Sequence, residues 1–330
     1  MTILVTGASG FVGSSVVRRL LEAGQSVRVM TRSSSRVENL RDLDVEIVNG
    51  DLLEPSTLMP ALEGCQGLYH VAADYRLWAP NPAPMFKANV EGTEALMRAA
   101  LKARVERIVY TSSVATMGID PSGEPADEIT PVAFADMIGP YKQSKFLAER
   151  AVRRLIVEEG LPAVIVNPST PVGPRDIKPT PTGRMIAEAA AGRMPAYVDT
   201  GLNIVHVDDV AAGHLLAYER GEVGRNYILG GDNMSLRDIL IKIAQLTGYP
   251  PPRVCLPHGV VMPLAFLAET WVRLAGKGEP FATVDGVKMA RKRMFFSSSR
   301  AIAELGYRHR PACHALADAV AWFRDNGHMA

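Results

Sequence analysis

The chain has 330 residues, 47% of them hydrophobic, and a formal net charge of +1 at neutral pH. This length suffices for one large domain or two smaller ones, and the balanced charge, without blocks of like charges, implies no nucleic-acid partner. Cys65, Cys255 and Cys313 lie far apart and form no CxxC pair, which argues against a disulfide framework or a zinc site and predicts a cytoplasmic location.

The first 170 residues alternate between short β-branched runs and helical patterns. The runs that predict strands are residues 2–7, 26–32, 45–51, 67–73, 107–113 and 163–169. The segments between them that predict helices are residues 13–24, 56–65, 89–105 and 141–160. Nearly continuous apolar strands separated by helices indicate a parallel sheet covered on both faces. The predicted fold class is therefore α/β, a doubly wound (Rossmann) sheet whose ligands bind at the carboxyl ends of the strands.

Beyond residue 170 the pattern changes. Residues 170–184 are rich in Pro and Gly and predict a loop. A strand and helix over 201–221, a strand over 225–231 and a helix over 235–248, with Ser235 as N-cap, follow. We expect a dinucleotide-binding domain over 1–172, to which 203–231 returns, and a smaller, mainly helical C-terminal substrate lobe over 173–202 and 232–330.

The most apolar late stretch covers residues 259–276, but Pro263, Glu269 and Arg273 interrupt it. It is too interrupted to span a bilayer, so we predict no integral membrane segment. The expected structure is an amphipathic helix packed on the protein. A surface that meets a membrane-borne substrate is the alternative.

A glycine-rich segment, TGASGFVG, follows the first predicted strand and opens the first predicted helix. Gly7, Gly10 and Gly13 form a G-x-x-G-x-x-G pattern. Glycine permits a tight turn and lets backbone N–H groups approach a pyrophosphate at the positive end of a helix. The strand–turn–helix context is the one a dinucleotide-binding loop requires, so we predict a dinucleotide site here.

The second predicted strand ends at Thr31 and Arg32, where NAD-binding proteins usually carry an Asp or Glu for the ribose 2′-hydroxyl. No carboxylate stands there to repel a 2′-phosphate, and an arginine could bind one in bidentate fashion. We therefore predict NADP as the cofactor, with NAD as the alternative. Asp51, which ends the third strand, is expected either to bind the adenine amino group or to cap the next turn.

Three further residues suggest catalysis. Ser113 lies in YTSSVATMG at the end of the fifth predicted strand, and Tyr141 and Lys145 stand four residues apart on one face of a long predicted helix. We expect Ser113 to hold the substrate oxygen, Tyr141 to move a proton to or from it, and Lys145 to bind the nicotinamide ribose. The ammonium group and an oxidised nicotinamide ring would lower the pKa of Tyr141 from about 10 toward working pH.

Together, TGASGFVG, YTSSVATMG and YKQSK resemble the extended short-chain dehydrogenase/reductase family, and the similarity runs over the whole chain. NVEGT (89–93) and VHVDDVAAGHLLA (205–217) are further stretches of this kind. Within the family, VAADYRLWAP (71–80) and residues 167–184 and 194–211 resemble hopanoid-associated sugar epimerases, a group related to dihydroflavonol reductases.

The resemblance implies that Ser113, Tyr141 and Lys145 are the catalytic residues. It also implies a homodimer formed by the helices that start near Asn89 and Tyr141. The predicted cofactor-binding set, which includes Tyr141 and Lys145, is completed by Gly7, Ser9, Gly10, Phe11, Val12, Gly13, Arg32, Asp51, Leu52, Ala72, Ala73, Thr111 and Pro168.

Two departures from the family pattern bear on the reaction. Val114 and Ala115 follow Ser113, where nucleotide-sugar 4,6-dehydratases carry an Asp–Glu pair, which disfavours dehydration. Arg32 is more typical of reductases that consume NADPH than of epimerases that retain NAD.

The substrate side is expected around the fourth strand and the Pro-rich loop. Its predicted members are Asp74, Tyr75, Arg76, Trp78, Arg175 and Arg184. The loop after the fourth strand could stack on and bind a sugar or polyol, or simply pack as a loop. The arginines, with Lys178, could bind a diphosphate or remain solvated. His206 beside Asp208 and Asp209 does not define a ligand geometry, so no metal is predicted.

These observations predict an NAD(P)-dependent oxidoreductase of the extended short-chain type. The first hypothesis is a sugar epimerase associated with hopanoid biosynthesis, acting on a sugar, a nucleotide sugar or a hopanoid-linked polyol. The second is an NADPH-dependent ketone or aldehyde reductase resembling dihydroflavonol reductase. A non-catalytic protein that senses NADP(H) is the alternative of another class, and the presence of Ser113, Tyr141 and Lys145 together argues against it.

Overall fold

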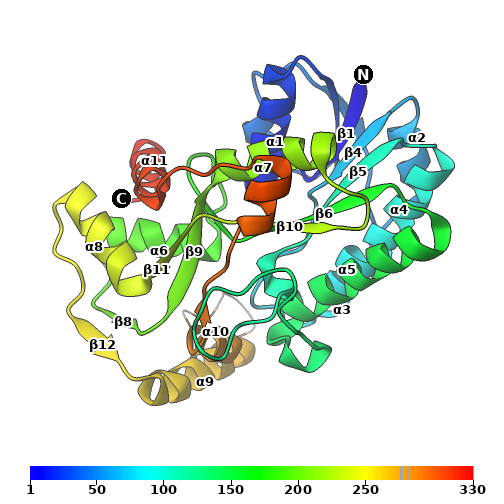
Figure 1. Cartoon of the computed structure of the whole chain (residues 1–330). Helices are drawn as coiled ribbons and strands as arrows, with labels where there is room; N and C mark the ends of the chain where they lie inside the picture. Colours follow the sequence, from blue (N-terminus) through cyan, green and yellow to red (C-terminus); the bar gives the residue numbers. More distant parts are fainter. Residues whose placement is uncertain (276–277, 279, 281, 330) are drawn as a thin grey trace.

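The protein is described by a computed structural model that covers residues 1–275, 278, 280 and 282–329 (Figure 1). A parallel sheet with strand order β10-β6-β5-β4-β1-β2-β3 forms its centre. The strands are β1 (Thr2–Thr6), β2 (Ser26–Thr31), β3 (Glu46–Asn49), β4 (Gly67–His70), β5 (Arg107–Thr111), β6 (Ala163–Pro168) and β10 (Asn226–Leu229). The order reverses between β1 and β4, and the carboxyl ends of such neighbouring strands are where doubly wound sheets bind ligands.

Helices cover both faces of this sheet (Figure 1). One face carries α1 (Phe11–Glu22) and α7 (Val207–Arg220), and the other carries α2 (Leu58–Leu62), α4 (Thr93–Lys102) and α5 (Gly139–Glu159). Successive side chains of a strand point to opposite faces. Ile3 and Val5 accordingly belong to the core under α1, whereas Leu4 belongs to the core under α4 and α5.

Short elements join these larger ones. They are α3 (Ala83–Phe86), the π-helical turns η3 (Lys87–Gly92) and η6 (Ala301–Leu305), and the 3₁₀ turns η1 (Glu38–Leu40), η2 (Pro55–Thr57), η4 (Val114–Thr116) and η5 (Phe134–Asp136).

A second, smaller part of the molecule lies beside the sheet (Figure 1). One of its sheets contains β7 (Thr170–Val172), β9 (Gly201–His206), β11 (Asp232–Ser235) and β13 (Arg293–Met294), and another pairs β8 (Ala196–Val198) with β12 (Val254–Leu256). Its helices are α6 (Pro181–Ala190), α8 (Leu236–Thr247), α9 (His258–Ala275), α10 (Val284–Ala290) and α11 (Ala312–Asp325). Ile186, Ile239 and Leu316 from α6, α8 and α11 share one core.

The structure confirms the predicted fold class and each predicted strand of the main sheet. The prediction of a loop over 170–184 is confirmed for residues 173–180 and was wrong at its ends, because Thr170–Val172 pairs with β9 and α6 begins at Pro181. The segment 203–231 also divides. Its helix α7 and strand β10 join the main sheet, while β9 joins the smaller one. Gly276, the last residue of the apolar stretch, lies outside the described residues.

The structure bears on two of the predictions about helices. Ser235 is the N-cap of α8, as predicted, and its hydroxyl accepts a hydrogen bond from Asp238 N at 3.1 Å. In the described part of the chain, no helix combines the length and apolarity needed to cross a bilayer.

Candidate active site

The glycine loop between β1 and α1 is shaped by close backbone contacts. Gly7 has a left-handed φ of +70°, and a Cβ on it would lie 2.6 Å from Ala72 N. A Cβ on Gly13 would overlap Gly7 O. Gly10 is the N-cap of α1, whose first turn carries no acidic residue. Because neither a side chain nor a negative charge competes for the N–H groups there, this helix end fits a pyrophosphate.

The end of β2 also fits the predicted cofactor. Arg32 follows β2 directly and its side chain is exposed, with Ser35 Oγ accepting a hydrogen bond from Arg32 N at 3.2 Å. Residues 31–36 contain no carboxylate. Asp51 Oδ1 accepts from Leu53 N at 2.9 Å, so this side chain caps its own turn, which is the alternative the sequence left open.

Buried hydrogen bonds fix the segments beside the glycine loop. Thr6 Oγ1 lies 2.7 Å from His70 Nδ1, and His70 Nε2 lies 2.9 Å from Thr93 Oγ1. Burial lowers the pKa of His70 to about 3, so the ring is neutral. Thr6 Oγ1 also accepts from Ala72 N at 3.3 Å, which holds the predicted Ala72 segment beside the glycine loop.

A buried hydroxyl after the end of β6 also suits the predicted cofactor. Pro168 is buried there, and the adjacent Ser169 Oγ is buried without a hydrogen-bond partner among the described residues. A buried hydroxyl of this kind requires a partner. At the carboxyl end of the sheet, a nicotinamide carboxamide can supply it.

The structure brings Ser113 and Tyr141 together. Ser113 is the N-cap of η4, where its Oγ accepts from Ala115 N at 3.1 Å, and its side chain lies close enough to the phenol of Tyr141 to lower the pKa of that phenol. Burial raises the pKa of Tyr141, and the Ser113 side chain lowers it only in part. The net shift from the protein's own groups is therefore upward, because loss of hydration outweighs the contribution of Ser113. The predicted lowering by Lys145 and an oxidised nicotinamide together stays a prediction.

The side chain of Lys145 is buried in the protein interior. Its Nζ donates to Thr111 O at 2.8 Å and to Tyr110 Oη at 3.3 Å. Burial lowers the pKa of Lys145 to about 8, against the charge of Glu149. In the described part of the chain the ammonium makes no hydrogen bond to Tyr141. Both side chains belong to the first turns of α5, and the electrostatic role expected for Lys145 toward Tyr141 stays a prediction.

A buried carboxylate joins the segments that carry the candidate catalytic residues. Glu149 Oε2 accepts from Ser112 Oγ at 2.6 Å, from Thr116 Oγ1 at 2.9 Å and from Asn167 Nδ2 at 3.1 Å. Its other oxygen accepts from Arg153 at 2.8 Å. This one side chain thus ties α5 to the ends of β5 and β6, on either side of Ser113. Ser112 is consequently a structural residue.

The loop after β4 forms one rim of the site. Asp74 pairs with Arg76 at 2.5 Å. Although burial raises it, the pKa of Asp74 is lowered overall by hydrogen bonds from Arg76 and by the charges of Arg76 and Lys178. The Pro-rich loop that carries Lys178 therefore faces this rim. Trp78 Nε1 is buried without a partner among the described residues, which leaves it available to a ligand.

An apolar cavity of about 360 Å³ adjoins the Ser113 and Tyr141 segments. Most of its apolar lining comes from methionine and isoleucine: Met117, Ile119, Met137, Ile138, Met289 and Met294. Lys142, next to Tyr141, and Lys292 also line it. Burial, reinforced by the charge of Lys292, lowers the pKa of Lys142 to about 8. Flexible methionine side chains suit an irregular apolar ligand.

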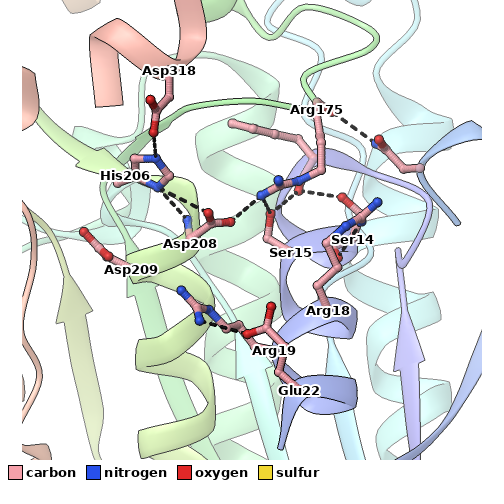
Figure 2. Close-up of polar contacts among 12 residues, drawn as sticks. Ser14, Ser15, Arg18, Arg19, Glu22, Arg175, His206, Asp208, Asp209 and Asp318 are labelled. Atoms are coloured by element: carbon pink, nitrogen blue, oxygen red, sulfur yellow. Dashed lines mark hydrogen bonds and ion pairs between the residues drawn. The ribbon is translucent and has the colours of Figure 1, made fainter. Parts of the chain in front are cut away.

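Figure 2 shows that the side chain of Arg175 points toward Ser15 of α1 and Asp208 of α7. Its guanidinium pairs with Asp208 and donates to Ser15 Oγ at 3.2 Å. The expectation that Arg175 binds a substrate diphosphate is not supported, because its charge is already neutralised. Arg184 is exposed in the first turn of α6 and stays a predicted substrate residue.

His206 has a structural role at the start of α7 (Figure 2). Its Nδ1 accepts from Asp208 N at 3.0 Å, and its Nε2 lies 3.0 Å from Asp318 Oδ2. Asp209 pairs instead with Arg310 at 2.7 Å. Within the residues that the structure describes, no cluster of His, Cys, Asp and Glu side chains could hold a metal ion.

Sequence reasoning missed Glu149, Ser169 and Asn89 as site residues. Asn89 Oδ1 accepts from Asp74 N at 2.7 Å, and its Nδ2 donates to Ser144 Oγ at 3.0 Å, so it fixes the rim loop to α5. Its place in NVEGT was the available signal. For Glu149, the signal was a carboxylate one turn beyond Lys145 on an otherwise buried helix face.

Comparisons with known proteins agree with this architecture. Residues 3–230 match the model of the NAD dependent epimerase/dehydratase family. The chain is 45% identical to a putative dihydroflavonol 4-reductase of Synechocystis sp., covering 98% of this chain and 95% of the relative. It is 37% identical to sterol demethylase protein B of Methylococcus capsulatus, covering 99% of both. Among solved structures, gox2253 is 56% identical with a TM-score of 0.90, covering 100% of this chain and 99% of the other.

Proposed function

Because the chain belongs to the NAD-dependent epimerase/dehydratase family, we propose that it interconverts a ketone or aldehyde and the corresponding alcohol on an amphiphilic substrate, with NADP(H). The observation that carries this proposal is the methionine-lined cavity, whose lining includes Met117 from the segment after Ser113 and Lys142 next to Tyr141. The cavity suits the apolar part of such a substrate, while Asp74, Arg76 and Lys178 offer polar groups on the other rim.

The chemistry of the site supports the reductive direction. When bound, the nicotinamide supplies the hydride. Ser113 Oγ would donate a hydrogen bond to the substrate oxygen, and Tyr141 Oη would protonate that oxygen as it gains charge. Burial raises the pKa of Tyr141, which keeps the phenol protonated at neutral pH, as a proton donor must be. Lys145 would hold the ribose from its position under Thr111 O.

The preference for NADP rests on Arg32. It is exposed at the end of β2, and the following residues carry no carboxylate. A guanidinium there would pair with the 2′-phosphate. The names of the relatives also favour a reductase, since one is a putative dihydroflavonol 4-reductase, and sterol demethylase protein B suggests a polycyclic, largely apolar substrate. A hopanoid-linked polyol, predicted from resemblance, would be of the same amphiphilic class.

The second candidate is the sugar epimerase. The family description and the polar rim of Asp74, Arg76 and Lys178 favour it. Against a nucleotide sugar stands Arg175, whose guanidinium is held by Asp208 and Ser15. An epimerase would oxidise and then reduce the same carbon, so it would consume no net cofactor.

One experiment separates these candidates. The chain is incubated with NADPH and, in separate reactions, with polycyclic ketones, aromatic ketones and uridine diphosphate sugars. Steady loss of reduced-cofactor absorbance with a ketone supports the reductase. An isomerised sugar without net loss of NADPH supports the epimerase and contradicts our first proposal.

We also propose that two chains pair through α4 and α5. Leu147 and Val157 on α5 are 36% and 84% exposed, which leaves apolar surface for a partner helix. A sedimentation experiment should give the mass of a dimer for the parent and of a monomer for Leu147→Glu/Val157→Glu.

A further inference from the structure

Helix α9 (His258–Ala275) exposes an unusual amount of apolar surface. Phe266 and Leu267 are each 63% exposed, Trp271 is 74% exposed and Leu274 is 82% exposed. Val260 and Leu264 add to the same surface at 54% and 45%. Soluble proteins rarely leave a contiguous apolar patch of this kind uncovered unless it meets a partner or a membrane.

The exposed residues form one face of the helix. Val260, Leu264, Leu267, Trp271 and Leu274 recur at intervals of four and three residues, which places them in one stripe. Phe266 widens this stripe on one side. The other side of α9 packs against the rest of the protein, since Ala265 is buried and Glu269 Oε1 accepts a hydrogen bond from Val284 N of α10 at 2.7 Å. The stripe is therefore exposed to solvent. Helix α9 itself lies at the lower edge of the molecule in Figure 1.

Positive charges lie at both ends of the stripe. Arg273 is in the last turn of α9, with its side chain 64% exposed. At the other end, His258 Nε2 lies 3.1 Å from Ala290 O, which brings the end of α10 to the start of α9. The exposed residues Arg291, Lys292 and Arg293 follow there.

Few negative charges offset these groups. Glu269 is the one acidic residue in the sequence of α9; its side chain is 12% exposed, accepts from Val284 N of α10 and lies 3.6 Å from Arg273, so it offsets part of that charge. Asp199 lies 3.5 Å from Arg293 and offsets part of that cluster. The rim of the apolar stripe is therefore cationic overall.

We propose that α9 docks this protein onto the surface of a bilayer that contains anionic phospholipids, with its apolar stripe in the interface and its basic rim on the head groups. An amphipathic helix binds a membrane through buried apolar area and attraction to anionic lipid, and both contributions are present here. A second copy of this chain fits less well, because two such faces would bring their cationic rims together. The helix would lie in the interface without crossing the membrane.

The docked orientation would bring the membrane next to the candidate active site. The guanidinium carbon of Arg273 lies 5.2 Å from the centre of the Trp78 ring on the substrate rim. Met289 of α10 lines the apolar cavity beside Tyr141. A lipid-soluble substrate could thus enter from the bilayer; this step rests on the proposed function, whereas docking itself does not.

The test is flotation of the full chain with vesicles, which needs no substrate or turnover. Vesicles of phosphatidylcholine alone are compared with equimolar phosphatidylcholine and phosphatidylglycerol. The variants are Leu267→Ser/Trp271→Ser, which removes apolar area, and Arg291→Glu/Arg293→Glu, which removes the basic cluster. Ile129→Ser is the matched control, because Ile129 is 75% exposed but lies in a loop outside α9. Binding of NADPH reports whether each variant is folded.

We expect the parent and the control to float with anionic vesicles. The apolar variant should partition about tenfold or more weakly into both kinds of vesicle. The charge variant should bind the anionic vesicles more weakly but bind the phosphatidylcholine vesicles as the parent does. Added salt should likewise weaken the binding of the parent to the anionic vesicles. Absence of parental flotation, or unchanged flotation of the apolar variant, overturns the proposal. So does an oligomer that dissociates in Leu267→Ser/Trp271→Ser without a change in flotation, because the occupant of the stripe is then a second copy.

Discussion

Replacement of Lys145 by Met should remove activity without destabilising the protein at neutral pH. Lys145 is 3% exposed, and burial lowers its pKa from 10.5 to about 8. An unfolded chain binds the proton more tightly than the folded one, so the charged lysine opposes folding. This lowering of the pKa corresponds to a loss of folding stability of roughly 3 kcal/mol at pH 7.

The penalty depends on pH in a defined direction. Between pH 8 and 10.5 the folded lysine is neutral while the unfolded one still binds a proton, so stability rises with pH in this window. By pH 10 the penalty has fallen to about 1 kcal/mol. Methionine also loses the hydrogen bonds to Thr111 O and Tyr110 Oη, which costs about 1–2 kcal/mol at either pH. Lys145→Met should thus gain about 1–2 kcal/mol at pH 7 and be neutral or slightly less stable at pH 10.

The assay is denaturant unfolding of parent and variant at both pH values, together with NADPH turnover. Lys242→Met, which replaces an exposed lysine on α8, is the control and should change the free energy of unfolding by less than about 0.5 kcal/mol at both pH values. A Lys145→Met variant destabilised by more than about 2 kcal/mol at pH 7 would refute the reasoning, because the buried ammonium would then be a net stabilising group.

Three further predictions follow from the site. Arg32→Glu should raise the KM for NADPH about tenfold or more while leaving NADH usable, as steady-state kinetics with both cofactors would reveal; equal effects on the two would place the 2′-phosphate elsewhere. Gly7→Ala should abolish cofactor binding and destabilise the fold by more than about 1 kcal/mol, because Gly7 has a φ of +70° and a Cβ there would lie 2.6 Å from Ala72 N; retained binding in a titration would contradict this. Ser113→Ala should lower kcat about 100-fold with little change in melting temperature. Ser112→Ala should instead lower the free energy of unfolding by about 1–2 kcal/mol, because it removes a hydrogen-bond donor to the buried Glu149. The reverse pattern would exchange the roles of the two serines.

The sequence predicted the main sheet because each of its strands is a short apolar run between helical patterns. Strand β7 escaped prediction, since Thr170–Val172 contains Pro171 and its strand partner is the distant β9. Such pairings join segments far apart in the chain, and local propensity does not predict them. For the same reason the sequence left open whether the apolar face of residues 259–276 packs on the protein or meets a membrane, because periodicity cannot tell which apolar stripe the rest of the fold covers.

For the site, motif spacing was sufficient to bring Ser113 and Tyr141 together. It could not give the direction of the pKa shift of Tyr141, which depends on burial. Nor could it show that Asp208 already neutralises Arg175, since the two side chains meet only when α7 packs on α1. Glu149 was missed because a glutamate on a long helix is usually solvated, and only the packed ends of β5 and β6 turn it into a hydrogen-bond acceptor for Ser112, Thr116 and Asn167.

The most direct measurement of the central claim is single-turnover reduction by Tyr141→Phe with saturating NADPH and a ketone that the parent reduces. We predict cofactor affinity within about twofold of the parent and a reduction rate lower by about 100-fold or more, because the hydroxyl that protonates the substrate oxygen is gone. A Tyr141→Phe chain that reduces the ketone at the parental rate would show that the proton comes from another group.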